Sequence, residues 1–276
     1  MTDSTGGRRR RGRLLIIGGA ENRTCGSGPL ETFVRLAGAA GARVVVVTTA
    51  TELPEQVTAE YEAAFGRLGV TAVRELRLLG RAAADDPGVL EALEDATGVL
   101  FSGGDQSRIR TLVGSKTNEL LRRRLEDDGL VIAGTSAGAT AMGRWMILGG
   151  TGHEVAASTV RVGPGLGLME DVLIDMHFLE RGRLPRLLSG IALDTRLLGV
   201  GIDEDTAVVV SDGAFEVVGS GLVTVVDAGR ATVGYAAGDD EPMAMLNVDL
   251  HLLPAGCRFE MDRRRPVIGR RPGEES

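Results

Sequence analysis

The sequence predicts an α/β fold in which helices flank a mostly parallel sheet and antiparallel hairpins occupy the C-terminal third. Continuous apolar runs, typical of strands buried on both faces, alternate with segments of helical periodicity through the first two thirds of the chain. This alternation favours repeated βα units around a parallel sheet. After Gly199 the pattern changes to short strands separated by glycine-containing turns, which is typical of antiparallel hairpins.

Each expected element comes from one of these patterns. The strands expected to be buried on both faces are Leu14–Ile17, Val44–Val47, Val99–Phe101, Leu130–Ala133 and Val172–Ile174. The helices expected from apolar residues at helical spacing are Leu30–Ala40, Glu55–Leu68, Val89–Asp95, Ile109–Val113, Leu120–Leu125 and Leu184–Ala192. The hairpin strands are Ala207–Val210, Ala214–Val218, Leu222–Val226 and Ala231–Tyr235. Met245–Leu253 alternates strictly and is expected to be a half-exposed strand with His251 on its polar side.

Length and composition limit the possible classes of protein. The chain has 276 residues, 43% hydrophobic and 3% aromatic, which suits one large α/β domain with an aliphatic core. We expect this domain to span residues 13–262, between a disordered basic arm at 1–12 and a loose tail at 263–276. The net charge of −7 argues against non-specific binding to nucleic acids or anionic membranes.

The same survey argues against a membrane span and against disulfide chemistry. No apolar stretch reaches the roughly eighteen residues that a bilayer-spanning helix needs. Cys25 and Cys257 are the only cysteines, too few for a disulfide framework or a structural zinc site, which fits a cytoplasmic protein.

The segment from Gly134 to Gly138 is typical of a nucleophile elbow. It reads Gly-Thr-Ser-Ala-Gly, follows the apolar run ending at Ala133 and precedes a helical pattern. Glycines on both sides of Ser136 permit a sharp strand-to-helix turn that projects the serine hydroxyl. The amide of Ala137 would then donate a hydrogen bond to a developing oxyanion. The sequence therefore predicts a serine hydrolase. The alternative is a plain strand-to-helix turn, with or without a role in binding phosphate.

A reactive serine needs a base, and the chain contains three histidines. His177 follows the buried run Val172–Met176, at the strand end where sites in open α/β sheets collect. His153 belongs to a loop, and His251 belongs to the polar side of a late strand. The residue pattern favours His177, but the ordinary α/β-hydrolase order of serine, acid and histidine would instead demand His251.

The imidazole also needs a carboxylate that orients it. Asp203, Glu204 and Asp205 follow Leu198–Ile202, another expected strand, and offer three candidates in a row.

A second glycine-rich loop leaves the strand that ends at Phe101. It reads Ser-Gly-Gly-Asp-Gln over residues 102–106. The amide of Gly104 or a neighbour could complete an oxyanion hole with Ala137, and Gln106 could hydrogen-bond a substrate amide or carboxylate. The alternative is a plain βα turn.

Four ordered motifs give the chain a resemblance to the cyanophycinase family over roughly residues 14 to 255. They are Phe101–Gln106, Gly134–Ala139, Asp175–Phe178 with the arginines that follow it, and Gly201–Ala207, and the opening Ile17–Glu21 is also similar. The resemblance implies a flavodoxin-like fold related to class I glutamine amidotransferases and a cytoplasmic homodimer. It implies a serine exopeptidase that releases β-aspartyl-arginine dipeptides from cyanophycin, without a metal or organic cofactor.

The resemblance also implies individual roles. Ser136 would be the nucleophile, His177 the general base and Glu204 its orienting carboxylate. Substrate-binding residues would be Gln106, Asp175, Arg181, Arg183 and Arg186. The three arginines suit a polymer that carries carboxylate and guanidinium groups, because guanidinium forks bind carboxylates; a solvated helix-start face is the alternative.

The chain departs from the family pattern beside the histidine. Met176 stands where glutamine is usual, and Leu179-Glu180 replaces a more polar pair. These changes could remove a hydrogen bond to substrate and add negative charge near the arginines. One alternative function is an aspartyl dipeptidase or other small-peptide serine peptidase, and another is a non-catalytic binding protein on the same scaffold.

Overall fold

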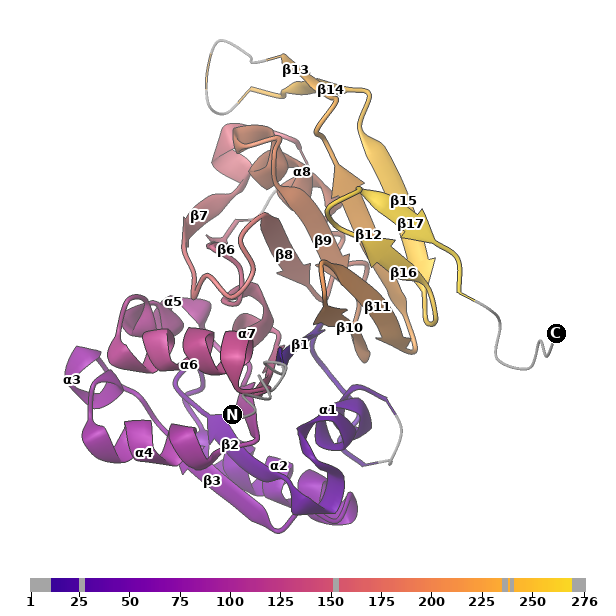
Figure 1. Ribbon diagram of the computed structural model, residues 1–276. Helices are drawn as coiled ribbons and strands as arrows, with labels where there is room; N and C mark the ends of the chain where they lie inside the picture. The colour runs from indigo at the N-terminus through magenta and orange to yellow at the C-terminus, as the bar shows by residue number, and fades with distance from the viewer. Residues whose placement is uncertain (1–10, 25–27, 151–153, 235–237, 239–240, 270–276) are drawn as a thin grey trace, which may run out of the picture.

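A computed structural model of the chain describes residues 11–24, 28–150, 154–234, 238 and 241–269 (Figure 1). Its larger sheet has nine strands in the order β17-β16-β11-β10-β1-β5-β4-β2-β3. Five of them are parallel, namely β1 (Arg13–Ile17), β2 (Arg43–Val47), β3 (Ala72–Leu76), β4 (Gly98–Phe101) and β5 (Val131–Thr135). The mostly parallel α/β core predicted from the apolar runs is therefore confirmed.

Antiparallel strands extend this sheet beyond β1. They are β10 (Thr206–Ser211), β11 (Ala214–Gly219), β16 (Arg258–Glu260) and β17 (Arg265–Val267). The prediction of a loose tail from residue 263 is wrong for Arg265–Val267, because these residues pair with β16. Residues 1–10 and 270–276 lie outside the described residues.

A second sheet stands beside the first. It has four strands in the order β15-β12-β9-β8, which are β8 (Val172–Met176), β9 (Leu198–Ile202), β12 (Leu222–Asp227) and β15 (Asp249–Pro254). Strands β8 and β9 are parallel, and the other pairs are antiparallel. Two-stranded ribbons are formed by β6 (Trp145–Gly149) with β7 (Arg161–Pro164) and by β13 (Thr232–Gly234) with β14 (Ala244–Leu246). The apolar run Val172–Ile174 thus belongs to a separate sheet and does not extend the parallel core.

Helices cover both faces of the parallel strands. They are α1 (Pro29–Ala37), α2 (Pro54–Arg67), α3 (Arg81–Ala84), α4 (Pro87–Asp95), α5 (Gln106–Ile109), α6 (Lys116–Asp127), α7 (Ala137–Thr140) and α8 (Leu184–Leu193), with 3₁₀ turns at Ala39–Gly41, Arg110–Leu112 and Ala157–Thr159. Alternate residues of a strand point to opposite faces, so Leu15 packs with Phe33 of α1 and Leu14 belongs to the cluster that contains Leu121 of α6. Each such fully buried side chain stabilises the fold by about 1.5–3 kcal/mol.

Helix α8 packs on the second sheet. Its Leu187 and Ile191 join Phe178 and Leu173 in a third buried cluster, while Ile174 and Val200, from the other face of this sheet, belong to the cluster shared with the parallel strands. The second sheet therefore lies between α8 and the larger sheet (Figure 1).

Some elements differ from the sequence-based expectation, and two of the differences have a clear physical reason. Strand β3 was not predicted, because as the edge strand of the sheet it has an exposed Arg74, a half-buried Glu75 and no continuous apolar run. The expected strand Met245–Leu253 is interrupted at Asn247, whose φ is 59°. Within β15, Leu250 and Leu252 are exposed and His251 is half-buried against the ring of Phe259, so the apolar side of this strand is the more exposed one.

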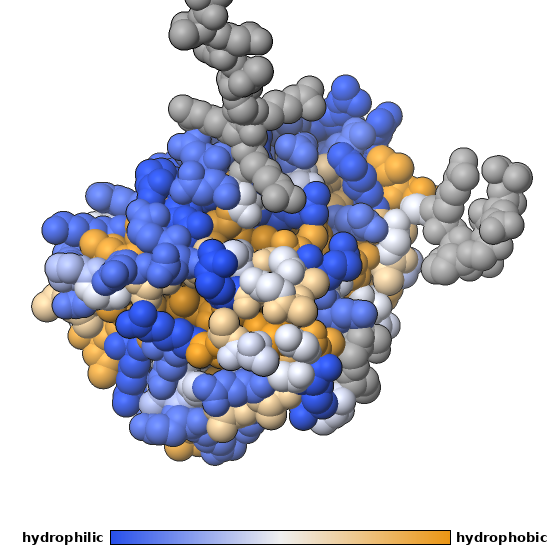
Figure 2. Space-filling view, turned by 60° about the horizontal axis from the view of Figure 1, so that its bottom comes forward, coloured by the Kyte–Doolittle hydropathy of each residue, from blue (hydrophilic) through white to orange (hydrophobic). Residues whose placement is uncertain are grey.

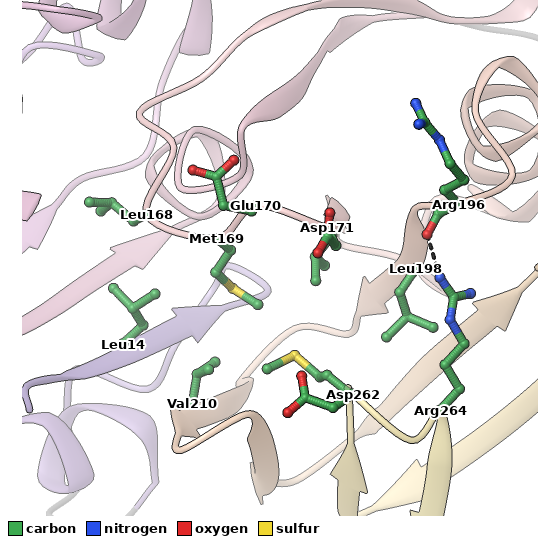
Figure 3. Close-up of a pocket in the computed structure, with 12 residues that line it drawn as sticks. Leu14, Leu168, Met169, Glu170, Asp171, Arg196, Leu198, Val210, Asp262 and Arg264 are labelled. Atoms are coloured by element: carbon green, nitrogen blue, oxygen red, sulfur yellow. Dashed lines mark hydrogen bonds between the residues drawn. The ribbon is translucent and has the colours of Figure 1, made fainter. Parts of the chain in front are cut away.

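The surface carries both hydrophilic and hydrophobic areas. On the face shown in Figure 2, hydrophilic side chains surround smaller hydrophobic areas. Within the described ranges, no helix combines the length and the apolar character needed to cross a bilayer. A cavity of about 510 Å³ opens where Leu14, near the start of β1, faces Leu198 at the start of β9 and Val210 of β10 (Figure 3).

Candidate active site

Ser136 occupies a strained turn between β5 and α7. Its φ of 51° and ψ of −112° lie outside the regions that L-amino acids usually adopt. The flanking glycines are required by close backbone packing: a Cβ at Gly134 would lie 2.4 Å from the carbonyl oxygen of Gly138, and one at Gly138 would lie 2.3 Å from that of Phe101. Such strain persists only where the surroundings over-determine the conformation. This is the geometry that a nucleophile elbow needs.

A chain of hydrogen bonds joins Ser136, His177 and Glu204. The Ser136 Oγ lies 2.9 Å from Nε2 of His177, and the Nδ1 of His177 lies 2.6 Å from Oε1 of Glu204. The residue His177 is 8% exposed, so its ring is largely shielded from water, whereas the side chain of Glu204 is 37% exposed. A serine, an imidazole and a carboxylate in this order can transfer the serine proton to Nε2 and stabilise the resulting imidazolium.

The end of β1 brings the three segments together. The carbonyl oxygen of Ile17 accepts a hydrogen bond from the Ser136 amide at 3.1 Å, that of Gly18 from the His177 amide at 2.8 Å, and that of Gly19 from the Asp205 amide at 2.9 Å. A Cβ at Gly18 would lie 2.0 Å from the carbonyl oxygen of Asp203. The three consecutive carbonyls of residues 17–19, called the seat below, thus hold the backbone of the nucleophile, of the base and of the acidic turn in place. The sequence contained a signal for this seat, the Gly18-Gly19 pair that directly follows a buried strand.

The three consecutive acids have different partners. Asp203 is buried and accepts the amides of Leu179 and Leu222 at 3.1 and 3.0 Å, while Asp205 accepts the amide of Asn22 at 2.9 Å. Burial raises the pKa of Asp203 and its two amide donors oppose that rise. Glu204 is the member of this run whose carboxylate contacts the imidazole of His177.

Of the two rival histidines, His251 lies away from this site. His251 lies on β15, opposite Val225, and its ring packs against Phe259 with centroids 5.7 Å apart. His153 lies outside the described residues. The structure therefore places His177, and not His251, beside Ser136.

The glycine-rich loop after β4 approaches the nucleophile. A Cβ at Gly103 would lie 3.4 Å from Cβ of Ser136 and 3.9 Å from its Oγ, so Gly103 is a neighbour of Ser136 that the sequence did not single out. Gly104 has a φ of +141°, and a Cβ there would lie 2.2 Å from the carbonyl oxygen of Ala50. Ala137 is the first residue of α7. Backbone amides of this loop and of Ala137 are the expected oxyanion donors.

Three of the expected substrate-binding residues are joined through Asp175 and form an arginine cluster, which consists of Asp175, Arg183 and Arg186. The other two, Gln106 and Arg181, have other hydrogen-bond partners. Asp175 is fully buried; its Oδ2 accepts Nε of Arg186 at 2.8 Å, and its Oδ1 accepts Nη2 of Arg186 and the amide of Met176. Arg183 donates to the carbonyl oxygen of Met176 and lies 3.5 Å from Asp175. Gln106 donates to the carbonyl oxygen of Ile147 at 3.0 Å.

Arg181 and Glu180 lie on the exposed turn after His177. The Arg181 amide donates to the carbonyl oxygen of His177, and the residue is exposed. The Oε1 of Glu180 accepts the amide of Glu204 at 3.1 Å. Glu180 therefore supports the backbone of Glu204, the acid in the hydrogen-bonded chain.

The guanidinium groups of the arginine cluster are partly buried. Burial lowers the pKa of Arg183 to about 10; the Asp175 carboxylate opposes this shift, whereas the guanidinium groups of Arg186 and Arg181 add to it. An additional carboxylate placed here would relieve this unfavourable charge. Among the described residues, no group of three or more His, Cys, Asp or Glu side chains is arranged to hold a metal ion.

An α/β sheet with an elbow serine that is hydrogen-bonded to a buried imidazole defines a serine-type hydrolase. The model of "Peptidase family S51" matches residues 14–218. The chain belongs to this family of serine-type peptidases.

Curated relatives show the same likeness over nearly the whole chain. It is 38% identical over 256 residues to a cyanophycinase of Trichormus variabilis, covering 91% of this chain and 86% of that protein. It is 35% identical over 265 residues to a cyanophycinase of Geminocystis herdmanii, covering 94% and 97%. It is 39% identical over 257 residues to a cyanophycinase of Synechococcus elongatus, covering 91% and 80%.

Solved structures show the fold. A peptidase from an acI-B1 Actinobacterium superposes with a TM-score of 0.64 at 23% identity, covering 86% of this chain and 95% of that one. A putative peptidase E from Listeria monocytogenes superposes with a TM-score of 0.52 at 16% identity, covering 75% and 97%.

Proposed function

We propose that this protein is a serine exopeptidase that hydrolyses cyanophycin to β-aspartyl-arginine dipeptides. The observation that carries the proposal is the Ser136, His177 and Glu204 chain in a protein 35–39% identical to cyanophycinases over most of its length. Membership of the S51 family supports the peptidase chemistry, and the named relatives support the polymer as substrate.

The geometry supports a two-step reaction through an acyl-enzyme. Ser136 attacks the α-peptide carbonyl of an aspartyl residue while Nε2 of His177 takes its proton, and the carbonyl oxygen becomes an oxyanion that accepts hydrogen bonds from the amides of Ala137 and the Gly103-Gly104 loop. The imidazolium, stabilised by Glu204, returns the proton to the departing amine. Water then attacks the acyl-enzyme with His177 as base and releases the acid, which regenerates the serine.

The arginine cluster suits the substrate. Cyanophycin carries an arginine on each β-carboxyl of its polyaspartate backbone, and each of these arginines has a free carboxylate. Because Arg183 is partly buried and its pKa is lowered, a substrate carboxylate beside it would restore charge balance. Asp175 is engaged by Arg186, so we assign it the task of holding this arginine rather than of contacting the substrate. We also propose that the protein acts in the cytoplasm as a homodimer.

Product analysis on purified cyanophycin tests the proposal. Wild-type protein should release β-aspartyl-arginine from the insoluble polymer, detected by mass spectrometry, and Ser136→Ala should release none while keeping its circular dichroism spectrum. Turnover by folded Ser136→Ala would refute the assignment. Cleavage of free α-aspartyl dipeptides with intact polymer would instead identify a dipeptidase. Absence of labelling by a fluorophosphonate probe would indicate a binding protein.

A further inference from the structure

The carboxylate of Glu21 is buried and takes no part in the proposed reaction. Its side chain has no exposed surface. Three side chains donate to it: Oγ1 of Thr135 to its Oε2, Oη of Tyr61 to its Oε1 at 2.6 Å, and the guanidinium of Arg23 to its Oε1 at 3.0 and 3.1 Å. Removing a carboxylate from water is costly unless hydrogen bonds and an opposite charge compensate it, and here both are present.

These donors link the nucleophile to the segment that seats its partners. Thr135 is the last residue of β5 and directly precedes Ser136. Glu21 lies two residues beyond Gly19, in the segment whose carbonyls at 18 and 19 hold the amides of His177 and Asp205. The side-chain bond from Thr135 to Glu21 therefore joins the strand end that carries the serine to the turn that carries the seat of the histidine.

We propose that Glu21 is a positioning residue that keeps the Ser136 hydroxyl in line with His177 by fastening Thr135. The proposal rests on the triad assigned under the proposed function. The strained backbone of Ser136 can relax unless its neighbours are held, and Thr135 is the neighbour on its N-terminal side. A small displacement of the serine lengthens its bond to Nε2, and misplacement of reacting groups slows the chemical step far more than substrate binding.

A carboxylate suits this position because all three side chains donate to it. An ionised carboxylate accepts through both oxygens, whereas an amide offers one acceptor and two donors. The guanidinium of Arg23 can only donate, and it is held in place over the Tyr61 ring, 4.3 Å from the centroid, and by Glu60. Burial raises the pKa of Tyr61 well above its usual range, so its hydroxyl stays a donor. With glutamine at position 21, either its NH₂ group meets Arg23, which can only donate, or it meets Thr135, whose hydroxyl would then have to accept. In both cases the charge-assisted hydrogen bond from Thr135 to a carboxylate is lost.

Three variants test the proposal. Glu21→Gln removes the charge, Thr135→Val removes the hydroxyl at nearly constant volume, and Thr135→Ser keeps the hydroxyl. The readouts are kcat and KM for a peptide substrate, the second-order rate of fluorophosphonate labelling, and Tm. We expect Glu21→Gln and Thr135→Val each to lower kcat and the labelling rate about tenfold or more with KM within about twofold. Thr135→Ser should keep kcat and the labelling rate close to those of wild type. The double variant Glu21→Gln/Thr135→Val should be no slower than Glu21→Gln alone.

The chain contains a matched control pair in the same sheet. Thr48, fully buried after β2, donates its hydroxyl to Oε1 of Glu75 on β3 at 2.7 Å, so it repeats the threonine-to-glutamate bond away from the serine. Thr48→Val and Glu75→Gln should change Tm and leave the labelling rate within about twofold of wild type. If they slow labelling as much as Thr135→Val does, the effect is general destabilisation and the proposal fails.

The outcomes separate this inference from the substrate assignment. Folded Glu21→Gln and Thr135→Val that label as fast as wild type would overturn the positioning role. If Glu21→Gln does not fold, the Thr135→Val and Thr135→Ser pair decides the question. Wild-type protein that labels readily but leaves cyanophycin intact would overturn the proposed substrate alone, because the probe reports the serine without the polymer.

Discussion

Gly19 packs directly against the imidazole of His177. A Cβ at position 19 would lie 2.4 Å from Cε1 and 2.5 Å from Nε2 of that ring, and the φ of +105° at Gly19 disfavours any side chain. The same residue offers its carbonyl oxygen to the amide of Asp205. One position therefore sets both the place of the base and the place of the acidic turn.

Gly19→Ala should remove most of the activity. The added methyl group must push the imidazole away from Ser136, so we expect kcat to fall by about 100-fold or more, measured with a peptide substrate. Gly66→Ala on α2 is the control, because a Cβ there meets no atom within 4 Å. Full activity in Gly19→Ala would show that the imidazole position seen here is not the reactive one.

Glu204→Gln should separate Glu204 from its acidic neighbours. The amide keeps the size of the side chain but can present NH₂ to Nδ1 of His177 and favour the wrong tautomer, so kcat should fall by about 10⁴-fold. Asp205→Asn should be nearly silent, since its oxygen can still accept the amide of Asn22. Steady-state kinetics of both variants would contradict the assignment if Asp205→Asn were the more damaging.

Glu180→Ala tests the support that Glu180 gives to Glu204. Loss of the acceptor for the Glu204 amide should loosen the turn and lower kcat about threefold to tenfold, whereas Glu180→Gln keeps an acceptor oxygen and should remain close to wild type. Equal kcat losses in both variants would mean that the charge of Glu180, and not its hydrogen bond, matters.

Asp175 and Arg186 should act as a stability pair. Asp175→Asn leaves a buried guanidinium without its counter-charge, so the free energy of unfolding should fall by about 3–5 kcal/mol. The double variant Asp175→Leu/Arg186→Met removes both charges and should be less destabilised than Asp175→Asn. Urea denaturation measures both. Unchanged stability with a raised KM in Asp175→Asn would instead indicate direct substrate contact.

The buried carboxyl group of Asp203 should make the stability of the protein fall as the pH rises. Burial raises its pKa in the folded protein above the ordinary 3.8, so the folded state favours the protonated acid. Its contribution to stability is fully present below that ordinary value and is lost as the pH rises through the raised pKa. As the pH rises above the ordinary value of 3.8, wild type should therefore lose stability relative to Asp203→Asn. A difference between the two that does not change with pH, in urea denaturation at several pH values, would contradict the shift.

Local patterns predicted much of the fold because their causes are local. The runs at Leu14–Ile17 and Val44–Val47 indicated buried parallel strands, since only strands covered on both faces are apolar throughout. Strand β3 was missed because an edge strand needs no such run. The exposure of Leu250 and Leu252 was missed because alternation alone does not say which side of a strand meets the core.

The sequence by itself determined the elbow and the candidate side chains. The glycines at 134 and 138 act on a turn within four residues, so their spacing carries the geometry of Ser136 without reference to the rest of the chain. The motif order likewise identified the family, while the catalytic roles of Ser136, His177 and Glu204 stay predictions.

Only the tertiary structure decided which of these residues meet. The carbonyls of residues 17 to 19 accept amides from 136, 177 and 205, which are separated by dozens of positions in the chain. It also decided that Glu204 rather than Asp203 or Asp205 faces the imidazole, and that Asp175 is engaged by Arg186. Such choices depend on which backbone groups lie opposite each other after the sheets pack, and no local pattern of residues contains that information.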